Sequence, residues 1–201
     1  IIEYEVTYPS LDSTDIMLEM LPDKMIMKFK DDKFISNMSA GAGLIEMGVM
    51  VDSKNQDMYN LVKIFGDRYV LKLHGREVKT MTDVFPPFQL KELDTDLSIA
   101  DAKCKKVLLD FGITKSESFI FYYTDEIKIN NPNWYTPYNE IDGVLLDYRI
   151  ENYNMNMRLK AVKIIPQEIS DDIFEIDDRY QELSKEEFDE VIVQNMTAFM
   201  E

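Results

Sequence analysis

The chain has 201 residues and a formal net charge of −16, from 38 acidic and 22 basic side chains. This excess of negative charge repels phosphate groups, so neither nucleic acid nor an anionic lipid surface is an expected partner. Hydrophobic residues make up 45% of the chain, which predicts a folded protein with a substantial core and excludes the composition of a disordered chain.

The first part of the chain has the pattern of a series of β-strands joined by short turns. Large side chains alternate with polar ones from Ile2 to Tyr8, which is typical of a half-buried strand. The alternation continues in later segments, separated by turn-forming pairs such as Asp31-Asp32 and Gly66-Asp67. These further expected strands cover residues 24–30, 33–39, 44–51, 57–64 and 68–73. Their spacing predicts an antiparallel meander.

One early segment, Leu11 to Leu21, has a helical pattern instead. Serine and aspartate residues are available to cap it, and Pro22 stops it. Its apolar positions are Ile16, Met17, Met20 and Leu21. The pattern predicts a short amphipathic helix whose apolar stripe is buried against the sheet or against a ligand that lies on the sheet.

The second part of the chain resumes the strand pattern after an irregular stretch. Residues 74–101 contain Pro86-Pro87 and lack a clear period, so we interpret them as a connection between two halves of one sheet. Strands are expected at 104–111, 119–124, 144–153 and 157–165, with a loop around Trp134, the only tryptophan. Ser184 and Glu187 form a capping box that predicts a C-terminal helix. We expect a single domain, residues 1–201, with roughly eight to eleven antiparallel strands.

No group of residues has the spacing of an active site. His74 is the only histidine and Cys104 the only cysteine, so a multi-histidine or cysteine-based zinc site is excluded. The acidic clusters at 94–96, 171–172 and 177–178 lack the calcium-loop pattern and are interpreted as solvated turns. We expect no catalytic residue, metal ion or cofactor. Carboxylate chemistry with acids from distant positions is the enzymatic alternative.

Methionine is unusually abundant, with thirteen in the chain. Seven of them lie in the first quarter, at positions 17, 20, 25, 27, 38, 47 and 50. Flexible thioethers suit a surface that accepts apolar partners of variable shape, and they also serve as core filler. The candidate ligand-binding residues lie on the expected helix, on the next strand and in the tryptophan loop: Ile16, Met17, Met20, Leu21, Met25, Met27, Phe29 and Trp134.

Four segments carry a resemblance to a known group of proteins: Ile2–Val6, Leu21–Met25, Phe121–Ile127 and Glu140–Leu146. They resemble uncharacterised envelope proteins of Gram-negative bacteria, of the GLPGLI-type and LolA-like groups. The literal Gly-Leu-Pro-Gly-Leu-Ile signature is replaced by Glu-Ile-Asp-Gly-Val-Leu at 140–145.

The resemblance implies an exported protein, made with a signal peptide, often held as a lipoprotein, in the periplasm or at the outer membrane. It also implies a curved antiparallel sheet that forms an open half-barrel with short helices packed on its concave face. The chain begins at Ile1 without methionine, which is compatible with a removed leader or with a shortened sequence. No window approaches the roughly 20 apolar residues of a transmembrane helix.

Two functions are compatible with these expectations. The first is a non-enzymatic envelope protein that binds an apolar ligand, such as an acyl chain or the lipid of a lipidated protein, between the concave sheet face and the helix at residues 12–21. The second is a protein–protein interaction module that has a filled interior and binds through the loop at residues 130–138. A lined cavity would favour the first function, and a filled interior would favour the second.

Overall fold

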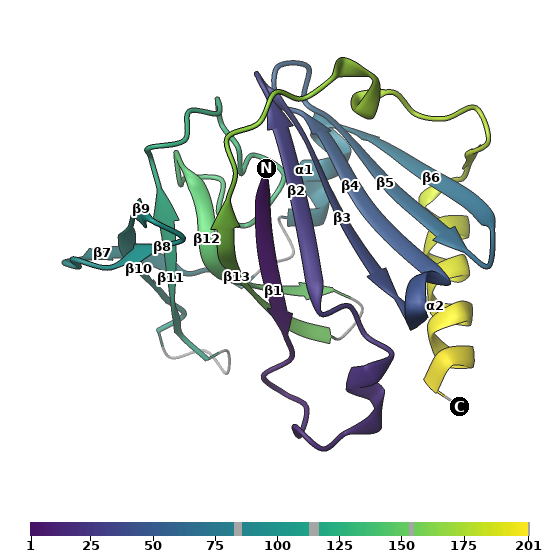
Figure 1. Ribbon diagram of the computed structural model, residues 1–201, viewed down its shortest axis with the longest axis horizontal. Coiled ribbons are helices and arrows are strands. Elements are labelled where there is room, and N and C mark those ends of the chain that lie inside the picture. The colour runs from purple at the N-terminus through teal and green to yellow at the C-terminus, as the bar shows by residue number, and fades with distance from the viewer. Residues whose placement is uncertain (83–85, 113–116, 153–154, 201) are drawn as a thin grey trace.

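The computed structural model describes residues 1–82, 86–112, 117–152 and 155–200. Its main feature is one large sheet of twelve strands, in the order β14-β6-β5-β4-β3-β2-β1-β13-β12-β11-β10-β7 (Figure 1). Neighbouring strands are antiparallel except for β14 and β6, which are parallel. Among the described strands, β14 and β7 form the two edges, so the sheet is open.

The chain builds this sheet from two consecutive halves. The first half is a meander of neighbours: β1 (Ile2–Thr7), β2 (Lys24–Lys30), β3 (Lys33–Ala40), β4 (Ile45–Asp52), β5 (Asp57–Ile64) and β6 (Asp67–His74). The second half consists of β7 (Gln89–Leu93), β10 (Lys105–Asp110), β11 (Phe119–Thr124), β12 (Val144–Asn152) and β13 (Met155–Ile164). The last of these pairs with β1 and joins the two halves.

Smaller elements complete the fold. A two-stranded hairpin contains β8 (Ser98–Ile99) and β9 (Ala102–Lys103), and the edge strand β14 spans Gln181–Glu182. The α-helices are α1 (Gly75–Thr82) and α2 (Lys185–Met200). The 3-10 helices are η1 (Ile16–Glu19), η2 (Gly41–Gly43) and η3 (Asp171–Phe174).

The predicted fold class is confirmed at the level of a mainly β protein with one large, almost wholly antiparallel sheet and a C-terminal helix. The predicted capping box is also present, because the Ser184 amide donates to Glu187 Oε2 at 2.9 Å and the Glu187 amide donates to Ser184 Oγ at 3.3 Å. The expected strand number was too low. The irregular stretch 74–101 contributes α1 and the edge strand β7, and the short β14 adds the one parallel pair.

The prediction of an amphipathic helix at 11–21 is wrong. Only the single 3-10 turn of η1 forms, and Asp15 caps it by accepting a hydrogen bond from the Met17 amide at 2.9 Å. Other hydrogen bonds fix the segment. The Leu11 amide donates to the Tyr8 carbonyl at 3.0 Å, and the Tyr8 hydroxyl donates to the Pro22 carbonyl at 2.8 Å. These bonds hold residues 8–22 as an irregular loop.

Strand register places most of the buried side chains of both halves on one side of the sheet, here called the covered face. Directly opposed residues in an antiparallel ladder share a face. Tyr4 lies opposite Met25 and Ala161, and Phe34 lies opposite Val51. Two clusters of buried residues form on this face. One lies over β1 and β10–β13, and the other lies over β3–β6, where Val78 of α1 and Phe188 of α2 pack against it.

The other side of the sheet, here called the open face, is crossed over β2–β6 by residues 165–183, here called the strap. Lys30, Arg68 and Lys72 all project from the open face, because their sequence neighbours belong to the covered one. Each of these side chains pairs with an acid of the strap: Lys30 with Asp171 at 2.8 Å, Arg68 with Asp177 at 4.0 Å, and Lys72 with Glu182 at 2.6 Å. The chain therefore passes across the open face to reach β14 and α2.

Candidate functional site

Five of the eight candidate ligand-binding residues belong to the core clusters or pack against them, whereas Ile16, Met17 and Met20 do not. Met25 is buried on the covered face, with Met27 and Phe29 partly buried beside it on the same strand. Ile16 and Met20 are exposed, while Met17 and Leu21 are partly buried. Because η1 is one turn of 3-10 helix with no buried residue, the common buried stripe that the helical pattern predicts is not formed.

Trp134 lies in the long loop between β11 and β12, residues 125–143, here called the covering loop. This loop extends across the covered face and reaches both clusters of the core. Tyr138 packs in the first cluster, with its ring centroid 5.1 Å from that of Phe121. Trp134 and Tyr135 pack against the second cluster, where the Tyr135 ring lies 5.4 Å from that of Phe34.

Hydrogen bonds fix the backbone of the covering loop and the side chain of Tyr138. The buried Asn133 side chain donates from Nδ2 to the carbonyls of Ile141, at 2.7 Å, and Gly143, at 2.8 Å. The Tyr138 hydroxyl donates to the Arg149 carbonyl of β12 at 2.5 Å. Most buried polar groups of a core are paired in this way, although the buried Trp134 Nε1 has no hydrogen-bond partner in the part of the chain that the structure describes. The two core clusters and the aromatic side chains of the covering loop occupy the covered face.

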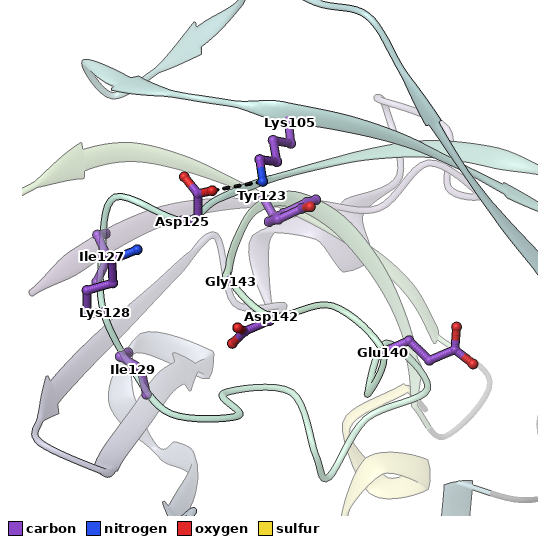
Figure 2. Close-up of a pocket in the computed structure, with 9 residues that line it drawn as sticks. All are labelled: Lys105, Tyr123, Asp125, Ile127, Lys128, Ile129, Glu140, Asp142 and Gly143. Carbon is purple, nitrogen blue, oxygen red and sulfur yellow. Dashed lines mark ion pairs between the residues drawn. The ribbon is translucent and has the colours of Figure 1, made fainter.

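A pocket of about 330 Å³ lies where the covering loop leaves β11 and returns to β12 (Figure 2). It is lined by residues of β10, β11 and the two ends of the loop: Lys105, Tyr123, Asp125, Ile127, Lys128, Ile129, Glu140, Asp142 and Gly143. Two of the segments that carry the resemblance, 121–127 and 140–146, therefore meet at this pocket. Reasoning from the sequence missed it, because the two segments are separated by the whole covering loop.

Gly143 is required by the close approach of strands at the pocket. A Cβ atom at this position would lie 2.5 Å from Tyr123 Cδ2 and 2.7 Å from the Thr124 carbonyl oxygen. Both distances are shorter than any side chain tolerates, and the second neighbour is backbone that cannot give way. The glycine therefore lets the loop return directly beside β11, where the pocket forms.

Two of the charged groups that line the pocket are paired with each other. Lys105 Nζ lies 2.8 Å from Asp125 Oδ2 and 5.7 Å from the centroid of the Tyr123 ring. Figure 2 shows Lys105 and Asp125 pointing toward each other, with Glu140 directed away from them. The hydrogen bond from Lys105 lowers the pKa of Asp125, and the same contact raises the pKa of Lys105.

These shifts hold Asp125 and Lys105 in their charged forms at neutral pH, which suits recognition of a charged group more than proton transfer. Burial raises the pKa of the Tyr123 hydroxyl, and the hydrogen bond that it makes to Glu92 Oε1 at 3.1 Å acts in the same direction. That hydroxyl therefore stays protonated near neutral pH.

The surroundings of Cys104 and His74, the other residues considered from the sequence, do not indicate a catalytic role. Cys104 is buried, and burial raises the pKa of its thiol, which disfavours the reactive thiolate. His74 is exposed, with Nδ1 2.5 Å from Asp57 Oδ1. Within the described ranges, no three His, Cys, Asp or Glu side chains are grouped as metal ligands. In the same part of the chain, no helix combines the length and apolar character needed to cross a bilayer.

Comparison with solved structures shows a likeness of fold. A solved structure described as "Structure of PNGF-II in P21 space group" matches 95% of this chain with a TM-score of 0.56 and 12% sequence identity. The match covers 32% of that chain, so the present chain spans about a third of its length. At this identity the likeness concerns the fold alone. No family model matches the sequence, and no curated protein matches it.

Proposed function

We propose that this chain is a non-enzymatic interaction module of the cell envelope, in the periplasm or at the outer membrane, that binds a partner protein through its surface. The placement in the envelope rests on the sequence resemblance to GLPGLI-type and LolA-like proteins. As part of the same proposal, the sheet acts as an open half-barrel whose concave side is the covered face.

The observation that carries this proposal is the filling of the covered face. Tyr138, Phe121 and Tyr148 are buried there, and the Tyr138 ring lies 6.4 Å from that of Tyr148. The pocket of about 330 Å³ lies beside this core and has four carboxylate or ammonium groups on its loop residues alone: Asp125, Lys128, Glu140 and Asp142. A ligand pocket for an acyl chain is expected to be predominantly apolar.

The carrier of an apolar ligand, the first function considered from the sequence, has less support. Its ligand was expected between the sheet and the helix at 12–21, and that helix is replaced by a loop with Ile16 and Met20 exposed. Part of the loop at 130–138, the binding element of the second function, is also occupied, because Asn133 and Tyr138 are buried. We therefore place the partner's binding surface elsewhere on the molecule.

Native mass spectrometry of protein purified without detergent tests the proposal. We expect the mass of the chain alone, and no uptake of a fluorescent fatty acid. A protein that binds fatty acids serves as the positive control for the dye assay, and circular dichroism confirms that the chain is folded. A retained lipid mass, or saturable uptake of the fatty acid by the wild-type protein, would contradict the proposal.

A further inference from the structure

One end of the β2–β6 half of the sheet has a row of exposed apolar side chains, here called the apolar rim. It consists of Ile16, Met20, Leu44 and Phe65, which expose 80%, 40%, 51% and 63% of their surface. Single exposed apolar residues are ordinary, whereas a contiguous group on a soluble surface marks an interaction site.

The three turns that bear the rim are joined by backbone hydrogen bonds, so its residues are neighbours in space. The Gly41 amide donates to the Met20 carbonyl at 3.1 Å, and the Leu44 amide donates to the Gly41 carbonyl at 3.1 Å. The Phe65 amide in turn donates to the Leu44 carbonyl at 3.0 Å. In Figure 1 this end of the sheet is the lower one, where η2 and the turn between β5 and β6 lie.

The backbone conformation at Phe65 favours a different type of residue. It and Gly66 form the two-residue turn between the paired residues Ile64 and Asp67, with φ of 51° and 104°. Two successive positive φ angles are typical of a type I′ turn, which favours Asn-Gly. A bulky residue in the left-handed region is strained, and such strain is found at functional positions. Phe65 therefore exposes 63% of its surface at the tip of this turn, beside the other residues of the rim.

The border of the rim is negatively charged. Asp12, Asp15 and Glu19 lie on the same loop as Ile16, and Asp67 follows the turn of Phe65. None of these four acids forms an ion pair within the part of the chain that the structure describes. The hydrogen bonds that Asp12 accepts from Thr14 lower its pKa, so it is charged at neutral pH.

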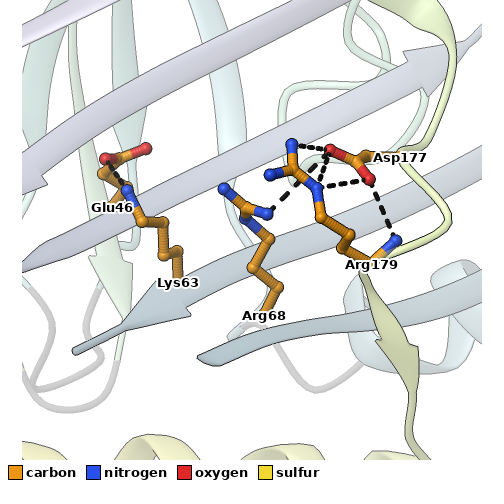
Figure 3. Close-up of polar contacts among 5 residues, drawn as sticks. All are labelled: Glu46, Lys63, Arg68, Asp177 and Arg179. Carbon is orange, nitrogen blue, oxygen red and sulfur yellow. Dashed lines mark hydrogen bonds and ion pairs between the residues drawn. The ribbon is translucent and has the colours of Figure 1, made fainter. Parts of the chain in front are cut away.

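Several basic side chains on and beside the neighbouring open face are already paired with acids (Figure 3). Lys63 Nζ lies 2.6 Å from Glu46 Oε1 across β5 and β4. Arg68 and Arg179 both contact Asp177 of the strap. The rim therefore combines an apolar row with an excess of unmatched negative charge.

We propose that the apolar rim binds an amphipathic, positively charged segment of a partner protein. Apolar side chains of that segment pack on Ile16, Leu44 and Phe65, and its lysine and arginine residues face the acidic border. Charge complementarity of this kind steers partners together and selects among them. A second copy of this chain is disfavoured, because two chains of charge −16 repel each other. The inference rests on the proposed interaction function and names the chemistry of the partner.

Fluorescence anisotropy with a labelled amphipathic Leu/Lys peptide tests the proposal, with a Leu/Glu peptide of the same pattern as the charge control. We expect saturable binding of the Leu/Lys peptide that weakens as salt is raised, and no binding of the Leu/Glu peptide. The Ile16→Ser/Phe65→Asn variant should bind the Leu/Lys peptide about tenfold more weakly, because apolar anchors carry most of the affinity of such contacts. The Glu19→Gln/Asp67→Asn variant should also bind more weakly and lose part of the salt dependence.

The matched control is Ile120→Ser/Val162→Ser, which removes two exposed apolar side chains elsewhere on the sheet. It should bind as the wild-type protein does. Circular dichroism and urea unfolding confirm that each variant is folded. No binding by the wild-type protein, or equal binding by the wild-type and rim variants, would overturn the proposal.

Two further outcomes would overturn it in favour of another occupant. Binding to phosphatidylcholine vesicles that is lost in the rim variant, without peptide binding, would assign the rim to a membrane. Self-association in sedimentation experiments that is lost in the rim variant would assign it to a second copy. A lipid retained in native mass spectrometry would contradict the proposed function. It would not change the comparison of peptide binding between the rim and control variants. Failure of the proposed function can therefore be distinguished from failure of the rim proposal.

Discussion

The covering loop and the strap each cross one face of the same sheet, and they are held there by different forces. The covering loop inserts aromatic side chains into the core, with Tyr138 buried between Phe121 and Tyr148. The strap is held by ion pairs whose acids, Asp171 and Glu182, are largely exposed, and by the backbone pairing of β14 with β6. Burial of apolar area gives a stability that is insensitive to salt, whereas exposed ion pairs are weak and are screened by salt. Truncation of core side chains in the covering loop should therefore lower the stability of the protein strongly, whereas changes of charge in the strap should lower it weakly.

The largest expected effect is that of Tyr138→Ala. Truncating a buried aromatic side chain removes its packing and leaves a cavity, so we expect a loss of about 3 to 5 kcal/mol in the free energy of unfolding. Urea unfolding followed by circular dichroism measures this loss. The control Tyr138→Phe removes only the hydrogen bond to the Arg149 carbonyl and should cost about 1 kcal/mol. Equal losses for the two variants would show that the ring contributes little to the core.

A smaller loss is expected for Asn133→Ala. The variant leaves the carbonyls of Ile141 and Gly143 without their side-chain donor in a buried setting, which costs about 1 to 3 kcal/mol. The same urea titration measures it. Asn139→Ala, an exposed position of the same loop, is the matched control and should leave stability unchanged. A destabilised control would mean that the loop responds to any truncation, and not to the loss of these two bonds.

Neutralising the acids of the strap should have a smaller effect that depends on pH. Lys30 lowers the pKa of Asp171, and Arg179 lowers the pKa of Asp177. A carboxyl whose pKa is lower in the folded state stabilises the protein above its unfolded pKa, near 3.8 for aspartate, and this stabilisation is lost as the pH falls further. Asp171→Asn/Asp177→Asn should therefore lower the urea midpoint at pH 7, and the difference from the wild-type protein should shrink below pH 4.

The control for the strap changes the same number of charges. Asp172 and Asp178 are the sequence neighbours of the two acids and form no ion pair within the described ranges. Asp172→Asn/Asp178→Asn should leave the urea midpoint close to that of the wild-type protein at both pH values. If both double variants lower the midpoint equally, then general charge, and not specific pairing, holds the strap.

Most strands could be predicted from the sequence because alternation of apolar and polar residues is a local signal. The bounds of β2 and β5, Lys24–Lys30 and Asp57–Ile64, agree with the expected ones at both ends. The helix expected at 11–21 failed because a few apolar residues at helical spacing do not offset the cost of helix nucleation. The turn expected at Gly66-Asp67 lies at Phe65-Gly66, because phenylalanine gives no turn signal.

The candidate site was less predictable than the fold, because it depends on contacts between segments that are distant in the chain. Lys105 and Asp125 belong to different elements, and Gly143 reaches them only after the covering loop has crossed the covered face. The sequence predicts solvated turns at 171–172 and 177–178, and it gives no sign that Asp171 and Asp177 there pair with basic residues of the open face. The local sequence pattern does not show which strand a charged side chain will contact in the folded protein.

The smallest expected effect, of opposite sign, is that of Phe65→Asn on stability. Asparagine tolerates the left-handed backbone conformation that Phe65 adopts at φ of 51°, and it is favoured in a type I′ turn before glycine. Relief of this strain should raise the free energy of unfolding by up to about 1 kcal/mol, measured by urea unfolding. Phe65→Ala is the control, because alanine removes the ring without favouring the left-handed region, and it should not raise stability. A loss of stability in Phe65→Asn would show that the ring supports the turn between β5 and β6. A gain, combined with weaker binding of the Leu/Lys peptide, would separate the two roles of this position and identify Phe65 as a residue kept for contact with a partner at the expense of the fold.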